Sequence, residues 1–317
     1  MERIKRYLDK AQTIAVVSHV NPDGDTVGSA LALVAVLRAA GKDATSVCEN
    51  RLPDDLSALP YADIFAKGDI DKAYDLAFCV DVASPNMLGQ ASRTVKNARH
   101  AVCIDHHLNH DLYTDVDYVV ERAANTENMY DFLSTYYPQY IDKAVAECLY
   151  TGLVTDSGGF SYASVDEHTH TVAAKLVAYG IDNERICYEQ LRKQTLKFIR
   201  ARSEAYAKAL YAFGNRVAII VFSREIMQKY AITVAELVGP LVEIMRADEI
   251  VLAASLVEMD NNRYKVSVRS KRPVSAANVC NTFGGGGHFN AAGCQLNGSE
   301  GIVIDMLLEA IGKELPE

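Results

Sequence analysis

Several features are missing from this chain of 317 residues, and each absence narrows what the protein can be. Its seven cysteines form no Cys-x-x-Cys pair, which argues against a cysteine-built zinc site, and their number and spacing favour reduced thiols. No apolar run approaches the roughly 20 residues that a membrane span needs. No signal peptide precedes the first predicted strand. We therefore expect a cytoplasmic protein with no membrane partner.

The chain also lacks an excess of positive charge. Its 32 Lys and Arg residues are outnumbered by 41 Asp and Glu residues, so the formal net charge is -9 at pH 7. A non-specific binder of long nucleic acid is normally basic. We therefore expect no long duplex nucleic acid as a partner, whereas a small anionic substrate held by local cations is compatible with this charge.

The length and the pattern of apolar residues predict two α/β domains. Up to about residue 181, short apolar runs alternate with helical segments, which predicts a mostly parallel sheet with helices on both faces. Residues 182–213 are helical and polar and are assigned to a connector. Residues 214–317 are predicted to form a smaller α/β domain, with helices near 233–246 and from 289. The first domain is therefore taken as residues 1–181.

Two helix starts in the first domain carry cap signals. Asp142 precedes the apolar helical segment 142–154 and suits an N-cap position. Ser164-Val165-Asp166-Glu167 has the form of a capping box and is expected to open the helix that ends at Gly180.

Polar residues follow three of the predicted buried strands, where each strand ends. The run 13–18 leads into His19, Asp23 and Asp25, and the run 76–80 leads into Asp81. The run 101–104 leads into Asp105-His106-His107. Ligands of open α/β sheets bind at the carboxyl ends of such strands. We therefore expect these side chains to share one edge of the sheet, together with Asp156, which follows a helical segment.

These residue types predict a binuclear metal site. Carboxylates combined with imidazole suit Mn²⁺ or Mg²⁺ better than a soft metal. Taken alone, Asn21-Pro22-Asp23-Gly24-Asp25 is equally consistent with a solvated turn. Taken together, the acids and histidines match a two-metal hydrolytic site, in which a carboxylate bridges the ions and water is activated between them.

A second candidate site lies near the end of the chain. Gly284 to Gly287 precede His288 and a predicted helix, so their backbone N–H groups could bind an anion. The alternative is a flexible linker. Arg269, Lys271 and Arg272 form a basic patch just upstream, and arginine is the natural bidentate ligand of phosphate.

These motifs resemble the DHH phosphoesterase family over nearly the whole chain. His19-x-Asn21-Pro22-Asp23-x-Asp25 is similar to its first motif, Asp81 to its second, Asp105-His106-His107 to its third and Asp156 to its fourth. Gly284-Gly285-Gly286-Gly287-His288-x-x-Ala291-Ala292-Gly293 resembles the glycine-rich signature of the DHH-associated C-terminal substrate domain. The length is most similar to the nanoRNase/pAp-phosphatase type. One departure is Ala123-Ala124-Asn125-Thr126, where family members often have a Ser/Thr-rich helix start.

The resemblance implies roles for individual residues. One Mn²⁺ would be held by His19, Asp23 and Asp81, and a second by Asp25, Asp81, His106 and Asp156, with Mg²⁺ as the alternative ion. Asp81 would bridge the ions, and His107 would act beside the scissile phosphate. A non-scissile phosphate of the substrate would be bound by Arg269, Gly285, Gly286, Gly287 and His288.

The implied function is hydrolysis of short single-stranded oligoribonucleotides (nanoRNA) and 3',5'-bisphosphoadenosine (pAp) by a Mn²⁺-dependent, two-metal phosphoesterase. The alternative of the same chemical class is a phosphodiesterase for cyclic di-AMP or its linear product pApA. A non-catalytic nucleotide sensor is a third interpretation, which is disfavoured because every expected ligand is present. The family resemblance also implies a homodimer.

Overall fold

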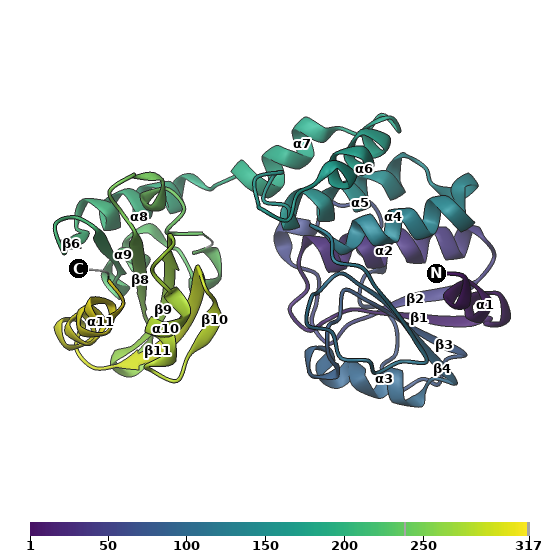
Figure 1. The fold of residues 1–317 in the computed structure, drawn as a ribbon, viewed down its shortest axis with the longest axis horizontal. Coiled ribbons are helices and arrows are strands. Elements are labelled where there is room, and N and C mark those ends of the chain that lie inside the picture. The colour runs from purple at the N-terminus through teal and green to yellow at the C-terminus, as the bar shows by residue number, and fades with distance from the viewer. Residues whose placement is uncertain (238, 316–317) are drawn as a thin grey trace. The chain divides into compact units, whose positions relative to one another are not determined.

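The computed structural model describes residues 1–237 and 239–315. The chain divides into two compact units, Met1–Lys193 and Gln194–Glu317, which are described separately (Figure 1). The segment predicted as a connector is thus shared between the two units. Among the described residues, no helix combines the length and apolar character needed to cross a bilayer. All seven cysteines are free thiols, and six of them are buried.

The first unit is built on a five-stranded sheet whose strand order is β2-β1-β3-β4-β5. All four neighbouring pairs are parallel, as the sequence predicted. The carboxyl ends of the adjacent strands β1, β3 and β4 therefore meet at one edge. The strands are β1 Thr13–Val17, β2 Asp43–Val47, β3 Leu76–Val80, β4 His100–Asp105 and β5 Val116–Val119.

Helices cover both faces of this sheet (Figure 1). Helices α2, α4 and α5 pack on one face over a core that includes Ile14, Val16 and Phe78. Helix α3 lies on the opposite face, where Ala15 and Cys79 are buried. The helices of the unit are α1 Glu2–Lys10, α2 Gly24–Ala39, α3 Ser92–Asn97, α4 Asn125–Tyr136, α5 Lys143–Asp156, α6 Glu167–Val177 and α7 Asn183–Cys187.

One of the two predicted helix caps is correct and the other begins two residues later than predicted. Asp142 caps α5 by accepting a hydrogen bond of 2.8 Å from the backbone N–H of Val145. The capping box of α6 starts at Asp166 and not at Ser164. Asp166 accepts from the backbone N–H of Thr169, while the hydroxyl of Thr169 takes the role expected of a glutamate.

The second unit is a six-stranded mixed sheet with the order β10-β11-β9-β8-β7-β6. Only the pair β7–β8 is parallel. Helices α10 and α11 cover one face and α8 and α9 the other. The elements are α8 Leu196–Ala207, β6 Leu210–Ala212, β7 Val217–Phe222, α9 Arg224–Tyr230, β8 Leu252–Glu258, β9 Arg263–Ser270, α10 Ala276–Asn281, β10 Gly286–His288, β11 Ala291–Asn297 and α11 Glu300–Glu314.

Two predicted helices of this unit are wrong. The described residues of the segment 233–246 form the 3-10 turns Val234–Glu236 and Ile244–Arg246 and no longer helix, and residue 238 lies outside the described residues. Gly239 and Pro240 lie between the turns, and proline cannot donate the backbone hydrogen bond that a continuing helix needs. No helix starts at 289, because residues 289–290 form the turn of a hairpin between β10 and β11.

Candidate metal centre

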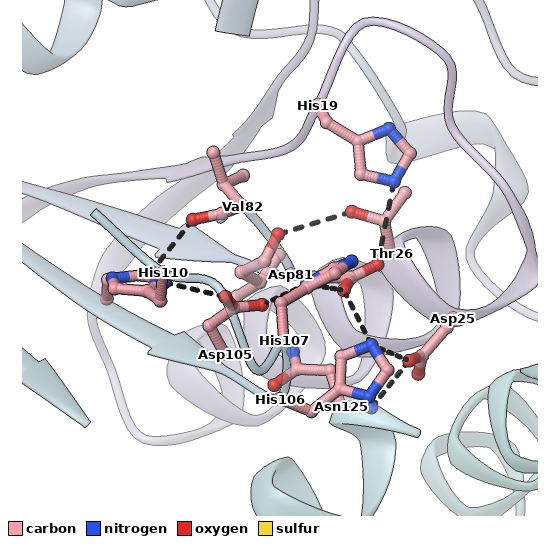
Figure 2. Close-up of polar contacts among 12 residues, drawn as sticks. His19, Asp25, Thr26, Asp81, Val82, Asp105, His106, His107, His110 and Asn125 are labelled. Carbon is pink, nitrogen blue, oxygen red and sulfur yellow. Dashed lines mark hydrogen bonds and ion pairs between the residues drawn. The ribbon is translucent and has the colours of Figure 1, made fainter. Parts of the chain in front are cut away.

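The side chains predicted from the strand ends lie together at the carboxyl edge of the first sheet (Figure 2). His19 follows β1, Asp81 follows β3, and His106 follows β4. The helix α2 begins beside them and contributes Asp25 from its first turn, while Asp156 ends α5. Four stretches of the chain that are far apart in the sequence, 19–25, 81, 106 and 156, therefore converge on one site.

Asp81 lies at the centre of this group. Its Oδ2 is 3.5 Å from Nε2 of His19, and its Oδ1 is 3.4 Å from Nε2 of His106. Its backbone adopts the left-handed region (φ 58°), which turns the chain sharply after β3. The residue is 3% exposed, and its Oδ1 is buried without a hydrogen-bond partner among the described residues. A buried carboxylate oxygen without a donor is costly unless a cation compensates it.

Most of the potential ligand atoms fall into two groups that meet at Asp81. His19, Asp23 and Asp81 form the first, and Asp25, His106 and Asp156 form the second. Asp81 also lies within reach of both His106 and His107, a combination that overlaps the two groups. Within each group the ligand atoms lie within 4.8 Å of one another. In the second group, Nε2 of His106 is 3.5 Å from Oδ2 of Asp156 and 3.9 Å from Oδ2 of Asp25.

The start of α2 fixes the two acids of the first loop. Asp23 is the N-cap of α2, and its Oδ1 accepts the backbone N–H groups of Asp25 and Thr26 at 3.1 Å each. Its side chain remains 56% exposed. Asp25 is buried, and its carboxylate accepts the backbone N–H groups of Asn125 and Thr126 at the start of α4. Asn125 and Thr126 are both fully buried, so in this structure their role is to hold the carboxylate of Asp25 in position.

His106 is oriented by a hydrogen bond on the side away from the acids. Its Nδ1 lies 3.1 Å from the carbonyl oxygen of Arg122, to which only an N–H can donate. The proton is therefore on Nδ1, and Nε2 faces the carboxylates as an unprotonated ligand atom whenever the ring is neutral. Metal-ligating histidines are held in this way.

A chain of hydrogen bonds leads from His107 into the protein (Figure 2). Nδ1 of His107 is 2.8 Å from Oδ1 of Asp105, and Oδ2 of Asp105 is 2.6 Å from Nδ1 of His110. Nε2 of His110 is in turn 3.1 Å from Oδ1 of Asp117. Asp105 thus holds His107, and His110 and Asp117 hold Asp105. The sequence analysis missed His110 and Asp117, although His110 stands only three residues after His107.

A third group of potential ligands, Cys103, His110 and Asp117, belongs to this chain of hydrogen bonds. Both ring nitrogens of His110 are already engaged by carboxylates, so this group favours a structural role over metal binding.

The electrostatics of the centre reflect crowded acids. Burial and the charge of Asp81 raise the pKa of Asp25 well above its ordinary value and raise the pKa of Asp156 to about 7. Burial opposes protonation of His106, but its contacts with Asp81 and the charge of Asp25 raise its pKa to about 11. Burial would also raise the pKa of Asp81, yet His106 and His19 outweigh it and hold that pKa below its usual range. The raised pKa values show that these buried acids resist ionising together, and bound divalent cations would favour their ionised forms.

The residues predicted to bind phosphate lie in the second unit, on one face of its sheet. His288 on β10 and Arg269 on β9 are both paired with Ala291 on β11, so the three form one row across the strands. Paired residues point to the same face, and Ala291 is too small to separate the two longer side chains. Gly286 and Gly293 are paired with each other in the same hairpin.

Glycine is required at two positions of this run. A Cβ atom at Gly285 would lie 2.3 Å from the carbonyl oxygen of Gly293, and Gly287 has a φ of 143°. Gly286 and Gly287 are paired with β11 as part of β10, so this half of the run is not the linker that the sequence left open. Because no helix follows it, no helix dipole assists anion binding here.

Two family models match the chain. Residues 13–153 match the model described as the DHH family, N-terminal domain, and residues 226–315 match the DHHA1 domain. The probable bifunctional oligoribonuclease and PAP phosphatase of Streptococcus mutans is 28% identical over 295 residues, which are 92% of this chain and 91% of the relative. The corresponding Thermus thermophilus protein is 27% identical over 322 residues, 98% of this chain and 96% of the relative.

A cyclic-di-AMP phosphodiesterase of Bacillus subtilis is 22% identical, and the match covers 99% of this chain but 49% of that protein. Among solved structures, an exopolyphosphatase-related protein from Bacteroides fragilis has a TM-score of 0.91 at 24% identity, covering 98% of this chain and 95% of that chain. The Mn²⁺ complex of RecJ from Thermus thermophilus has a TM-score of 0.54 at 14% identity, covering 100% of this chain and 54% of that one. These structures share the fold of this chain.

Proposed function

Because the chain belongs to the DHH phosphoesterase family, whose members depend on divalent metals, we propose that it is a Mn²⁺-dependent hydrolase of short oligoribonucleotides and 3',5'-bisphosphoadenosine. The observation that carries this proposal is Asp81, whose two carboxylate oxygens face the two groups of potential ligands. The names of the relatives that match over nearly their full length supply the substrate class.

The residues present fit two cations. His19, Asp23 and Asp81 would hold one, and Asp25, Asp81, His106 and Asp156 the other, with Asp81 shared. Carboxylate and imidazole donors suit Mn²⁺, and Mg²⁺ is the alternative. When bound, such a pair of ions activates water and neutralises charge that develops on a phosphoryl group.

We assign to His107 a role at the phosphoryl group itself. Nδ1 of His107 is hydrogen-bonded to Asp105, so the other ring nitrogen of His107, Nε2, is available to a substrate. The His107 side chain lies at the rim of the centre and is 38% exposed. The hydrogen bond to Asp105 raises the pKa of His107. A protonated His107 would donate a hydrogen bond to a phosphoryl oxygen and stabilise the charge that grows there.

We assign recognition of a second phosphate to the row of Arg269, Ala291 and His288 with the adjacent glycine strand. Ala291 is small and Gly285 to Gly287 have no side chains. A phosphate could therefore contact both the backbone of the glycine run and the Arg269 guanidinium. A phosphate bound there would favour substrates with a terminal phosphate, such as a short oligonucleotide or the bisphosphate.

A phosphodiesterase acting on cyclic di-AMP is the second candidate, and the Bacillus subtilis relative favours it. A cyclic dinucleotide has no terminal phosphate for the row of Arg269 and His288. The test is a product time course with Mn²⁺ and equal amounts of a 5'-phosphorylated dinucleotide, a longer oligonucleotide, 3',5'-bisphosphoadenosine and cyclic di-AMP.

Rapid loss of the linear dinucleotide and the bisphosphate, with the ring intact, is the expected result. Faster hydrolysis of cyclic di-AMP than of the linear substrates would instead support the cyclic-dinucleotide phosphodiesterase. Asp81→Asn serves as the control for a contaminating nuclease, because it removes the shared ligand at unchanged side-chain size. Tight nucleotide binding without turnover of any substrate would favour the sensor and overturn the proposal.

A further inference from the structure

A hollow of about 460 Å³ lies in the first unit, at the edge of the sheet opposite the metal centre. It lies between α1 and the starts of β3 and β4, and its lining includes Arg3, Arg6, Tyr7, Lys10, Arg99 and His100. His100 begins β4 and Asp105 ends it, so the hollow and the metal centre are separated by roughly 16 Å along that strand. The hollow is therefore not part of the proposed catalytic site.

The charge of this hollow is opposite to that of the whole chain. Four Arg and Lys side chains and one histidine line it, in a protein with a net charge of -9. Lys10 and Arg99 have no side-chain hydrogen bond or ion pair in the described part of the chain. Arg3 makes a single hydrogen bond of 3.5 Å, to the carbonyl oxygen of Asp115.

Most of the acids near the hollow form hydrogen bonds or ion pairs with other groups. Asp75, which also lines it, accepts hydrogen bonds from the backbone N–H groups of Gln12 and Thr13. Glu2 pairs with Arg6 on the surface of α1, and Asp115 pairs with His100. Among the described residues, Arg3, Lys10 and Arg99 therefore form no ion pair, and the charge of Asp75 compensates Arg99 only in part. Like charges gathered in this way repel each other, so an anion between them would be favourable.

We propose that this hollow binds a small anion that carries a diphosphate group, the chemistry shared by inorganic pyrophosphate and nucleoside diphosphates. Guanidinium groups bind phosphate oxygens in pairs, and an ammonium adds a point charge. The volume lies within the usual range of small-ligand pockets. Tyr7 and His100 pack edge to face with ring centroids 4.9 Å apart and offer an aromatic surface to a base. This site is independent of the proposed catalytic function.

The test is calorimetric titration of the full chain with ADP and, separately, with pyrophosphate, in the presence of EDTA so that the metal centre is empty. The double variant Lys10→Ala/Arg99→Ala removes the two unpaired cations. We expect one binding site in the wild-type protein and at least about tenfold weaker binding in the double variant, because the variant loses two charged hydrogen-bond donors. Tighter binding of ADP would identify a nucleotide as the ligand, and equal binding would identify the diphosphate alone.

Two control proteins separate this site from general charge effects and from the catalytic centre. Arg51→Ala/Lys96→Ala removes two exposed cations outside the hollow and should bind like the wild type. Asp81→Asn should also bind normally, and turnover by the Lys10→Ala/Arg99→Ala protein should be unchanged. The proposal is overturned if the wild type binds neither anion, if the double variant binds as tightly as the wild type, or if only Asp81→Asn abolishes binding.

Discussion

At the scale of single residues, the candidate metal centre is a set of acids that destabilise one another, and a bound cation would relieve this repulsion. Burial raises the pKa values of Asp23, Asp25 and Asp156, and the charge of Asp81 raises them further. His106 provides the partial compensation, because it is held near these acids in its protonated form. A bound cation would replace that proton, so metal binding and pH are linked.

We predict that the metal-free protein unfolds at a lower temperature at about pH 7.5 than at about pH 5.5. A carboxyl whose pKa is raised in the folded state, such as Asp156 at about 7, favours folding while it is protonated. That contribution is complete below the ordinary pKa and is lost as the pH rises through the folded value. The pKa of His106 is raised to about 11, so its contribution to folding stability also decreases as the pH rises. The lowered pKa values of Asp81 and Asp105 act only in more acidic solution.

Thermal unfolding in EDTA and in Mn²⁺ at both pH values checks this prediction. Mn²⁺ should raise the unfolding temperature more at the higher pH, because its ligands are then free of protons. Asp156→Asn should weaken the pH dependence measured in EDTA. An unfolding temperature that rises with pH in EDTA would contradict the assignment of the acids.

The positions of these residues could be predicted because they follow from strand geometry. Buried parallel strands must end at one edge, so His19, Asp81 and His106 had to be neighbours once the strands were recognised. The roles of His110 and Asp117 could not be predicted in the same way. His110 reaches Asp105 through the loop after β4, and Asp117 lies inside β5, so their contact depends on tertiary packing.

At the scale of elements, the close approach of α2 and α5 sets the spacing of the second ligand group. Asp25 lies in the first turn of α2 and Asp156 ends α5, so any shift between these helices changes their separation. Two glycines permit the approach. A Cβ at Gly28 would lie 2.3 Å from the carbonyl oxygen of Cys148, and one at Gly152 would lie 2.9 Å from Cα of Asp25.

We predict that Gly152→Ala lowers the free energy of unfolding by about 1–3 kcal/mol, the usual cost of overpacking. The new methyl group would also meet Thr126 and push on Asp25, so Mn²⁺ affinity should fall with it. Gly301→Ala is the matched control, because it lies in α11 with no atom within 4 Å of the new Cβ. That substitution should leave stability unchanged or raise it by up to about 1 kcal/mol. Chemical denaturation and Mn²⁺ titration of both variants measure the difference.

Elements were predictable where a single pattern dominated. The parallel sheet of the first unit was predicted correctly because three of its strands, β1, β3 and β4, contain uninterrupted apolar runs bounded by loops. The segment after 289 was predicted wrongly, although Ala292, Cys294 and Leu296 stand at alternate positions, which is the period of a strand. Their burial on alternate positions shows that pairing with β9 decided the outcome.

At the scale of the whole molecule, the two units divide the proposed chemistry. Among the described residues, the groups of potential metal ligands belong to the unit Met1–Lys193, whereas Arg269, His288 and β10 belong to Gln194–Glu317. The units have separate hydrophobic cores. A change in the proposed phosphate-binding row of the second unit should therefore leave the candidate metal centre unaltered.

We predict that Arg269→Ala raises the KM for 3',5'-bisphosphoadenosine by about tenfold or more, as expected for the loss of a charged hydrogen bond, while Mn²⁺ affinity stays unchanged. Steady-state kinetics and Mn²⁺ titration measure the two quantities. Arg263→Ala is the matched control, because it removes the same charge from the same strand and face, roughly 20 Å from the row. Equal effects of both substitutions would mean that the second unit attracts the substrate only through its general charge, and a loss of Mn²⁺ affinity in Arg269→Ala would show that the two units are coupled.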